Sequence, residues 1–157
     1  MDATTETAAG VLPAILALLG FALFWCVISF VLSRVSGWAT LARAYPAADV
    51  LTPNARWRWQ SVHMNGNTKY SGAVTIVADA HGVHFSMFPV LRAGHARFSV
   101  PWPDLHATPR QLLLAQRVVL TFAKAPAVSM LMWPTLADRL AAASQGRFTV
   151  TPAPPQS

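Results

Sequence analysis

The first hydrophobic pattern along the chain is a continuous apolar run near its beginning. Residues 11–32 include no charged side chain. At ~1.5 Å per residue a helix over this run would be about 33 Å long, which is enough to cross a hydrocarbon core of about 30 Å. The run therefore predicts a transmembrane helix over 11–33.

A secretory signal peptide is the alternative interpretation of this run. Signal peptides typically have a basic leader, a shorter apolar core and a small-residue cleavage site. The leader here, residues 1–10, contains Asp2 and Glu6 and no Lys or Arg. The sequence therefore favours a retained anchor.

A helical pattern continues beyond the apolar run with a different character. Apolar side chains, Trp38 and Tyr45 among them, recur three or four positions apart, while Arg34 and Arg43 lie off this stripe. The pattern predicts a juxtamembrane amphipathic helix and a linker over 34–54. One hypothesis lays the stripe on the membrane surface, where Trp and Tyr suit the headgroup level. The other packs the stripe on the domain that follows.

From residue 55 the hydrophobic period changes to two, which is typical of half-buried strands. The first alternating segment places Trp57 and Trp59 on one face and Arg56 and Arg58 on the other. Pro at the start, Asp138 early and Gly beyond the end predict a short helix over 134–144. The alternating segments are 56–63, 73–78, 83–90, 97–102, 118–122 and 128–133, with a further short candidate at 147–150.

Six or seven short strands and one helix within about a hundred residues define the expected fold class. We expect an α+β, mainly β, protein: one N-terminal transmembrane helix, then a small antiparallel β-barrel or sandwich with a C-terminal helix. The β domain should cover 55–150. Residues 151–157 should form a disordered tail.

Composition and charge predict where the chain lies and how it is oriented in the membrane. Hydrophobic residues make up 54% of the 157 residues and charged residues only 11%, which is typical of a chain with a segment in lipid. All 12 Lys and Arg follow residue 33 together with four acidic residues, a net charge of +8. Because basic flanks stay in the cytoplasm, we expect residues 1–10 outside the cell (inner) membrane and the domain in the cytoplasm. The only cysteine, Cys26, lies in the span, so no intrachain disulfide can form.

The stretch "LRAGHARFSVPWPDL", residues 91–105, carries a resemblance to a known family. It combines a glycine turn, an arginine-containing loop and a hydrophobic-Pro-Trp-x-Asp-hydrophobic corner. With the strand order and the late helix, it resembles small bacterial membrane proteins with a pleckstrin-homology-like, or GRAM-like, domain, over roughly residues 20–150. The resemblance implies such a fold for 55–150. Inositide-binding members place several basic residues between their first two strands, whereas here that loop has only Lys69, so the resemblance does not imply a phosphoinositide site.

Candidate chemistry gathers in residues 90–107, which hold two arginines, two histidines and an aspartate. We interpret this segment as a corner between strands, because it has no Cys or Glu and Ser99 lacks the flanking glycines of a nucleophile elbow. The five histidines lack the spacing and partners of a metal site, and paired carboxylates and Gly-rich phosphate loops are missing. We therefore expect no enzyme, no metal, no cofactor and no small-molecule substrate.

The first function hypothesis is a membrane-anchored, non-enzymatic interaction module at the cytoplasmic face. It would bind anionic lipid headgroups of the bilayer, a membrane protein partner or a second copy of itself. Nucleic acid is not expected, because a tethered domain meets lipid far more often. The candidate contact residues are Arg34, Trp38, Arg43, Tyr45, Arg92 and Arg97.

The alternative hypothesis is an accessory structural subunit of a larger membrane complex. Small side chains in the second half of the span recur at spacings of three and four, so they share one helical face that permits close helix approach. Serines that simply lie near the headgroups would give the same pattern. The candidate packing residues are Ala22, Cys26, Ser29 and Ser33.

Overall fold

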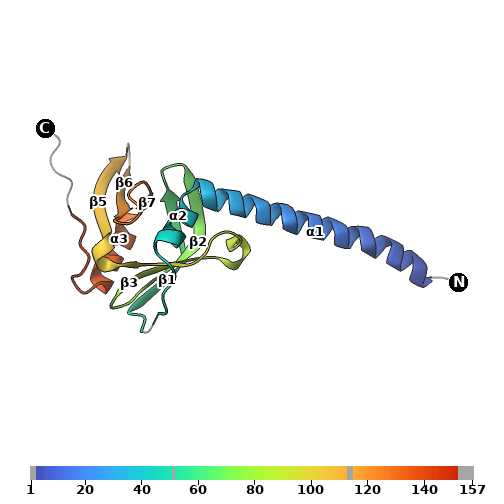
Figure 1. The fold of residues 1–157 in the computed structure, drawn as a ribbon, viewed down its shortest axis with the longest axis horizontal. Helices are drawn as coiled ribbons and strands as arrows, with labels where there is room; N and C mark the ends of the chain where they lie inside the picture. The colour runs from blue at the N-terminus through green and yellow to red at the C-terminus, as the bar shows by residue number, and fades with distance from the viewer. Residues whose placement is uncertain (1–2, 51, 113–114, 152–157) are drawn as a thin grey trace.

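The computed structural model describes residues 3–50, 52–112 and 115–151, with side chains from residue 11 onward, so the predicted tail lies almost wholly outside the described residues (Figure 1). Within these ranges the helices are α1 (Ala3–Val35), α2 (Trp38–Ala44) and α3 (Pro134–Ala143). The strands are β1 (Ala55–Met64), β2 (Thr68–Ala78), β3 (Gly82–Met87), β4 (Phe98–Pro101), β5 (Leu105–Leu112), β6 (Ala115–Phe122) and β7 (Ser129–Met132). Two single-turn 3-10 helices, η1 (Pro89–Leu91) and η2 (Trp102–Asp104), precede and follow β4.

The strands form one antiparallel sheet in the order β4-β3-β2-β1-β7-β6-β5. β1 lies at the centre, where it pairs along its length with β2 and near its end with β7. Because strands twist, the sheet curls into a half-barrel, as Figure 1 shows. The expected α+β class, with an apolar helix first and a helix last, is confirmed.

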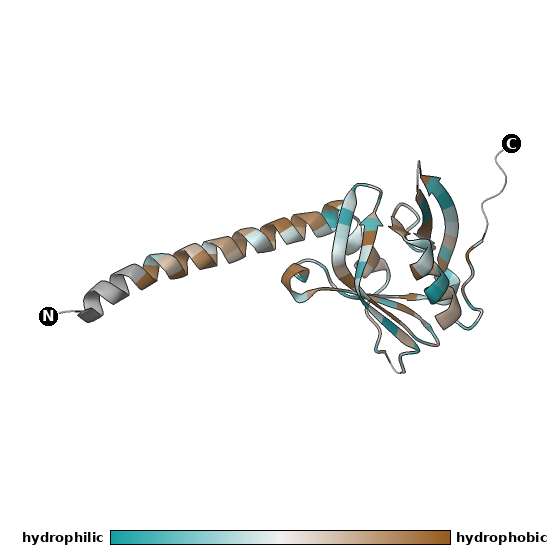
Figure 2. Cartoon of the chain, turned by 180° about the vertical axis from the view of Figure 1, so that it is seen from behind, coloured by the Kyte–Doolittle hydropathy of each residue, from teal (hydrophilic) through white to brown (hydrophobic). Residues whose placement is uncertain are grey.

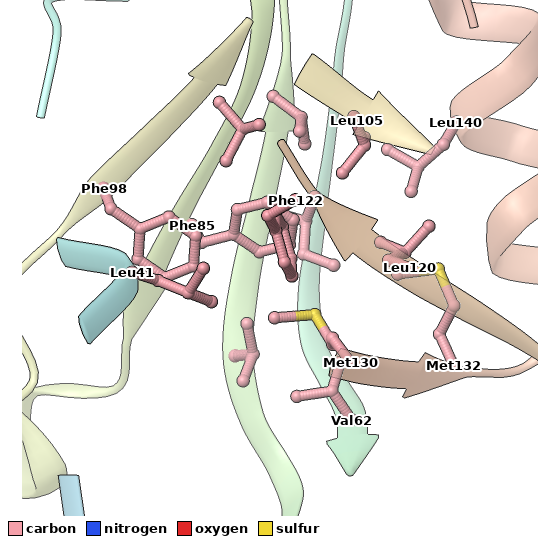
Figure 3. Packing of buried hydrophobic residues seen from close by; sticks show 14 of the residues in the cluster. Leu41, Val62, Phe85, Phe98, Leu105, Leu120, Phe122, Met130, Met132 and Leu140 are labelled. Atoms are coloured by element: carbon pink, nitrogen blue, oxygen red, sulfur yellow. The ribbon is translucent and has the colours of Figure 1, made fainter. Parts of the chain in front are cut away.

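The inside of the curled sheet is filled from two ends. Figure 3 shows Leu41 of α2 against Phe85 and Phe98, and Leu140 of α3 beside Leu105 and Leu120. All of these side chains are at least 95% buried. Each short helix therefore buries its apolar face in the space that the half-barrel leaves open.

Both edges of the sheet are partly covered by other parts of the chain. On β4, Pro46 forms an isolated bridge with Phe98. On β5, Val150 forms a parallel bridge with Ala107, whose carbonyl accepts the Thr151 N–H at 2.9 Å. The linker after α2 thus protects one edge and the end of the described chain protects the other.

The hydrophobic pattern missed β5. Only Leu105 and Ala107 of this strand are buried, so the apolar alternation that reveals a strand is absent. Among the described strands β5 pairs only with β6, and such an edge strand tolerates Pro109. The predicted strand at 147–150 is likewise reduced to the bridge at Val150. The hairpins and α3 lie where the pattern predicts them.

β1 is irregular at Trp59. Its pairing with β2 shifts register between Trp57 and Gln60, and Trp59 has a φ of 58°. Such a bulge turns a side chain toward the opposite face. Trp59 is therefore 62% exposed while Trp57 is half-buried, and the prediction that the two share one face is wrong.

A tight turn connects α1 to α2. Gly37 has a φ of 87°, in the left-handed region that favours glycine. A Cβ at this position would lie 3.0 Å from both Asn65 Nδ2 and the Val128 methyl groups. The turn therefore needs glycine for its conformation and for space, and it directs α2 back onto the sheet.

The apolar stripe of α2 lies in the domain core. Trp38 and Tyr45 are 0% and 2% exposed. The Trp38 indole N–H donates to the Ala96 carbonyl at 2.8 Å, and the Tyr45 hydroxyl accepts the Lys124 N–H at 2.7 Å. The prediction that Trp38 and Tyr45 lie at the headgroup level is therefore wrong, and the alternative, packing on the domain, is confirmed.

α1 is longer than the predicted span, since it begins at Ala3 and ends at Val35. Its part Val11–Val35 is long and apolar enough to cross a bilayer, a property that a signal sequence near the N-terminus would share. Figure 2 shows this helix mostly in brown and pale shades, with hydrophilic teal only near the end that meets the domain. Most of its large apolar side chains are exposed.

Candidate functional site

A groove of about 720 Å³ lies on the outer face of the β1–β4 part of the sheet. Thr75 and Val77 of β2 line it, while the alternate residues Val74 and Ile76 enter the core. The linker residues 47–50 form one wall, and the loop around η1 forms another. The groove thus uses the face of the sheet that the core leaves free.

Positive charge dominates the groove. Arg56 and Arg58 line it from β1, and Arg92 and Arg97 line it from the segment between η1 and β4. Asp49 is the acidic side chain among the lining residues. Like charges that converge on a concave surface focus the electrostatic field, and guanidinium groups bind phosphate or carboxylate oxygens in pairs. The groove is therefore suited to an anionic group.

One end of the groove is apolar. The rings of Trp59 and Phe88 lie with their centroids 4.9 Å apart, and these side chains are 62% and 39% exposed. Both residues line the groove, and η1 follows directly after Phe88. The arrangement fits a ligand that has an anionic part and an apolar part.

His84 joins Asp79 to Ser99 at the groove. Its Nε2 lies 2.8 Å from Asp79 Oδ2, and its Nδ1 lies 2.8 Å from Ser99 Oγ. Asp79 Oδ1 also accepts the N–H groups of His81 and Gly82. Burial alone would raise the pKa of Asp79, but these hydrogen bonds outweigh burial and hold its pKa below the ordinary value. The carboxylate is therefore ionised at neutral pH.

The order Ser–His–Asp is also that of a nucleophile, a base and an orienting carboxylate. Nucleophilic attack needs, in addition, N–H donors aimed at an oxyanion beside the serine. Two backbone N–H groups at this serine are already used: Ala48 donates to Ser99 Oγ at 2.9 Å, and Ser99 donates to the Tyr45 carbonyl at 3.3 Å. These contacts give the relay a structural role, because they hold the linker on β4.

Ser99→Ala should loosen the linker and leave the domain folded. The change removes the acceptor of the Ala48 N–H and one partner of His84, at an expected cost of about 1 kcal/mol. Amide hydrogen exchange at Ala48, measured on the full chain in detergent, should therefore accelerate roughly fivefold. A serine-directed fluorophosphonate should leave the wild type unlabelled. Labelling of wild type that disappears in Ser99→Ala would contradict the structural role.

A second polar cluster lies beneath the α1–α2 turn. His95 is fully buried, and its Nε2 lies 2.8 Å from the Tyr70 hydroxyl, which donates to Ser36 Oγ at 2.9 Å. Burial lowers the pKa of His95 and raises the pKa of Tyr70, so both groups are neutral at pH 7. The cluster ties the end of α1 to β2 and to the segment before β4.

The structure brings together only some of the predicted contact residues. Arg92 and Arg97 line the same groove. Arg34 is exposed at the end of α1, with its guanidinium 4.7 Å from the centre of the Phe30 ring. Arg43 is exposed on α2. Neither Arg34 nor Arg43 lines the groove.

The predicted helix-packing face is divided. Ala22 and Cys26 are exposed, whereas Ser29 and Ser33 are 1% and 0% exposed. The Ser33 hydroxyl donates to the Gly94 carbonyl of the chain's own loop. The expectation that a neighbouring helix packs on Ser29 and Ser33 is therefore wrong, because the domain itself covers them.

Sequence reasoning missed several residues of the site. Arg56 and Arg58 were placed on the polar face of β1, yet nothing along the sequence showed that this face adjoins Arg97. His84 and Ser99 are cross-strand partners of β3 and β4. The alternation of polar and apolar residues predicts that both side chains point outward. Only the register of β3 against β4 shows that they are neighbours.

Comparisons with known proteins give no name to this site. No family model matches the chain, and no curated protein matches it. Among the side chains that the structure describes, no group of three or more His, Cys, Asp and Glu residues is placed to hold a metal ion. The chemistry of the groove is therefore the guide to function.

Proposed function

We propose that this chain is a single-pass membrane protein whose β domain, of pleckstrin-homology-like type, is a non-enzymatic binding module for anionic lipid headgroups at the cytoplasmic face of the cell membrane. The observation that carries the proposal is the groove that four arginines and one aspartate line. Its apolar end, at Trp59 and Phe88, leads into the loop that contacts α1. A lipid likewise has an anionic headgroup next to an apolar acyl chain.

The contacts of α1 support a retained anchor. The described side chains of Ser29, Ser33 and Ser36 are buried where α1 meets the domain. If α1 were a cleaved signal peptide, its removal would expose the surface of the domain that now covers Ser29 and Ser33. Arg34 and Arg43 follow the apolar segment directly, which favours a cytoplasmic domain by the positive-inside rule.

Tethering makes a modest affinity sufficient. Each Lys or Arg near an anionic leaflet contributes about 1 kcal/mol. A domain fixed to the membrane meets headgroups at a high effective concentration, so it needs no deep, selective pocket. An open groove with several guanidinium groups is adequate for this task.

Charge reversal in the groove should strongly weaken the response to anionic lipid. We expect phosphatidylglycerol, added to the full chain in a zwitterionic detergent, to raise its unfolding temperature, whereas phosphatidylcholine should not. In Arg92→Glu/Arg97→Glu the apparent affinity for phosphatidylglycerol should fall about 30-fold, which corresponds to roughly 1 kcal/mol for each lost arginine. The effect should weaken as salt is raised.

A matched control separates the groove from overall charge. Arg110 and Arg139 are exposed and do not line the groove, so Arg110→Glu/Arg139→Glu makes the same change in net charge elsewhere. This variant should keep the wild-type response. An equal loss in both double variants, or no loss in the groove variant, would refute a headgroup site. Retention of a co-purifying membrane protein by wild type alone would instead identify a protein partner for the groove.

A further inference from the structure

The loop at η1 exposes a small apolar surface. Residues 88–91, here called the knuckle, include Phe88 at 39% and Val90 at 57% exposure. Figure 2 shows this loop in brown on the side of the domain from which α1 departs. The exposed Trp59 ring packs on Phe88 and extends the same surface. Neighbouring exposed apolar side chains of this kind are typical of a surface that contacts a protein or a membrane.

Specific contacts hold the knuckle beside α1. The Trp25 indole N–H donates to the Val90 carbonyl at 2.8 Å. Ser33 donates to the Gly94 carbonyl, and a Cβ on Gly94 would lie only 2.8 Å from Phe30 Cα. The loop is therefore held along the last third of α1.

The position of Trp25 sets the depth of the knuckle. Trp25 precedes Arg34 by nine residues, which is about 13 Å along a helix, whereas a headgroup layer is roughly 5 to 7 Å thick. With Arg34 among the headgroups, Val90 lies in the hydrocarbon. Counting from the other side agrees, because a span of about 20 residues that starts at Val11 ends at Phe30, beyond Trp25.

Most of the backbone polar groups of the knuckle are paired. The N–H groups of Phe88 and Leu91 donate to backbone carbonyls, and Pro89 has no N–H, whereas the Val90 N–H donates no hydrogen bond to the described residues. The Val90 carbonyl accepts the indole N–H from α1. In hydrocarbon an unpaired backbone group costs several kcal/mol, so this pairing removes most, but not all, of the cost of placing an irregular segment there.

We propose that the knuckle is inserted into the bilayer beside α1, with lipid acyl chains as its occupant. The proposal rests on the proposed function, since it requires α1 to span the membrane. Lipid is the occupant because the knuckle continues the exposed apolar surface of α1 and lies at the same depth. Arg92 follows the knuckle directly and lines the groove. Insertion therefore places the opening of the groove at the phosphate layer.

Depth-dependent quenching tests the insertion. In a Cys26→Ser background, an NBD fluorophore is attached at Val90→Cys, at Leu18→Cys in the middle of the span, or at Arg139→Cys on α3. The full chain is reconstituted in vesicles of phosphatidylcholine and phosphatidylglycerol that carry nitroxides on the acyl chains or on the headgroups. The label at residue 90 should be quenched more strongly by acyl-chain nitroxides than by headgroup nitroxides, as at residue 18. The label at residue 139 should respond to aqueous iodide instead.

A second variant tests the contact that holds the loop. Trp25→Phe keeps an aromatic ring and removes the N–H that donates to Val90, so acyl-chain quenching at residue 90 should decrease while quenching at residue 18 stays unchanged. An iodide-accessible label at residue 90 with a lipid-buried label at residue 18 would overturn the insertion and leave the span intact. Protection from iodide without acyl-chain quenching would also overturn it, because protein would then cover the knuckle. Exposure of residue 18 to water would refute the span itself.

Discussion

Trp38→Ala should strongly destabilise the β domain. Trp38 is fully buried, its rings pack edge-on against Tyr70, His95 and Phe98, and its indole N–H bonds the Ala96 carbonyl. Truncation of a buried tryptophan costs about 3 to 5 kcal/mol. Because small domains have only ~5 to 15 kcal/mol of stability, urea unfolding of the full chain in mild detergent should shift to much lower urea concentrations.

Trp133→Ala is the matched control for this experiment. Trp133 is 51% exposed, and its ring stacks on the guanidinium of Arg117 at 3.2 Å. Loss of such an exposed cation–π contact should cost only about 0.5 to 1 kcal/mol. Similar urea midpoints for the two variants would contradict the central position of Trp38 in the core.

Gly82→Ala should separate β3 from β4. A Cβ at Gly82 would overlap the Val100 carbonyl oxygen and lie 2.9 Å from the Val100 carbonyl carbon. These neighbours are backbone atoms in the paired strands, so no side-chain rotation can relieve the overlap. The same glycine donates its N–H to Asp79, so the change also disturbs the relay at His84. We expect a loss of about 3 kcal/mol, the upper end for overpacking, in the same urea measurement.

Gly66→Ala distinguishes overlap from backbone strain. Gly66 has a φ of 72°, but nothing lies within 4 Å of an added Cβ. The expected cost is therefore only about 1 kcal/mol, from the conformation alone. If Gly66→Ala destabilised the chain as much as Gly82→Ala, close packing of β3 on β4 would not explain the result.

Local patterns predicted most of the fold, because most elements bury one face. Val83, Phe85 and Met87 point inward along β3, and that alternation alone identifies the strand. The pattern did not predict β5, because β5 is an exposed edge strand with few buried side chains. The location of Trp38 was not predictable either, since an amphipathic helix has the same pattern whether it lies on lipid or on its own domain. The turn at Gly37, which directs α2 back onto the sheet, distinguishes packing on the domain from packing on lipid.

The site was predicted in part for a similar reason. Arg92 and Arg97 are close in sequence, and an arginine-containing loop between strands is visible without a structure. Arg56 and Arg58 line the same groove because β1, β2, β3 and β4 are consecutive in the sheet, so that its outer face continues from β1 to β4. Strand order is set by pairing between distant segments, and no local pattern encodes it.

The covered edges of the half-barrel limit how this domain can recognise another protein. A partner that adds a strand needs a free row of backbone N–H and C=O groups. The linker at Pro46 blocks part of that row on one side, and the segment at Val150 blocks part of it on the other. The same shielding opposes edge-to-edge aggregation among copies of the chain. Where the edges are covered, recognition depends on side-chain chemistry, which a few substitutions can change without any change of fold.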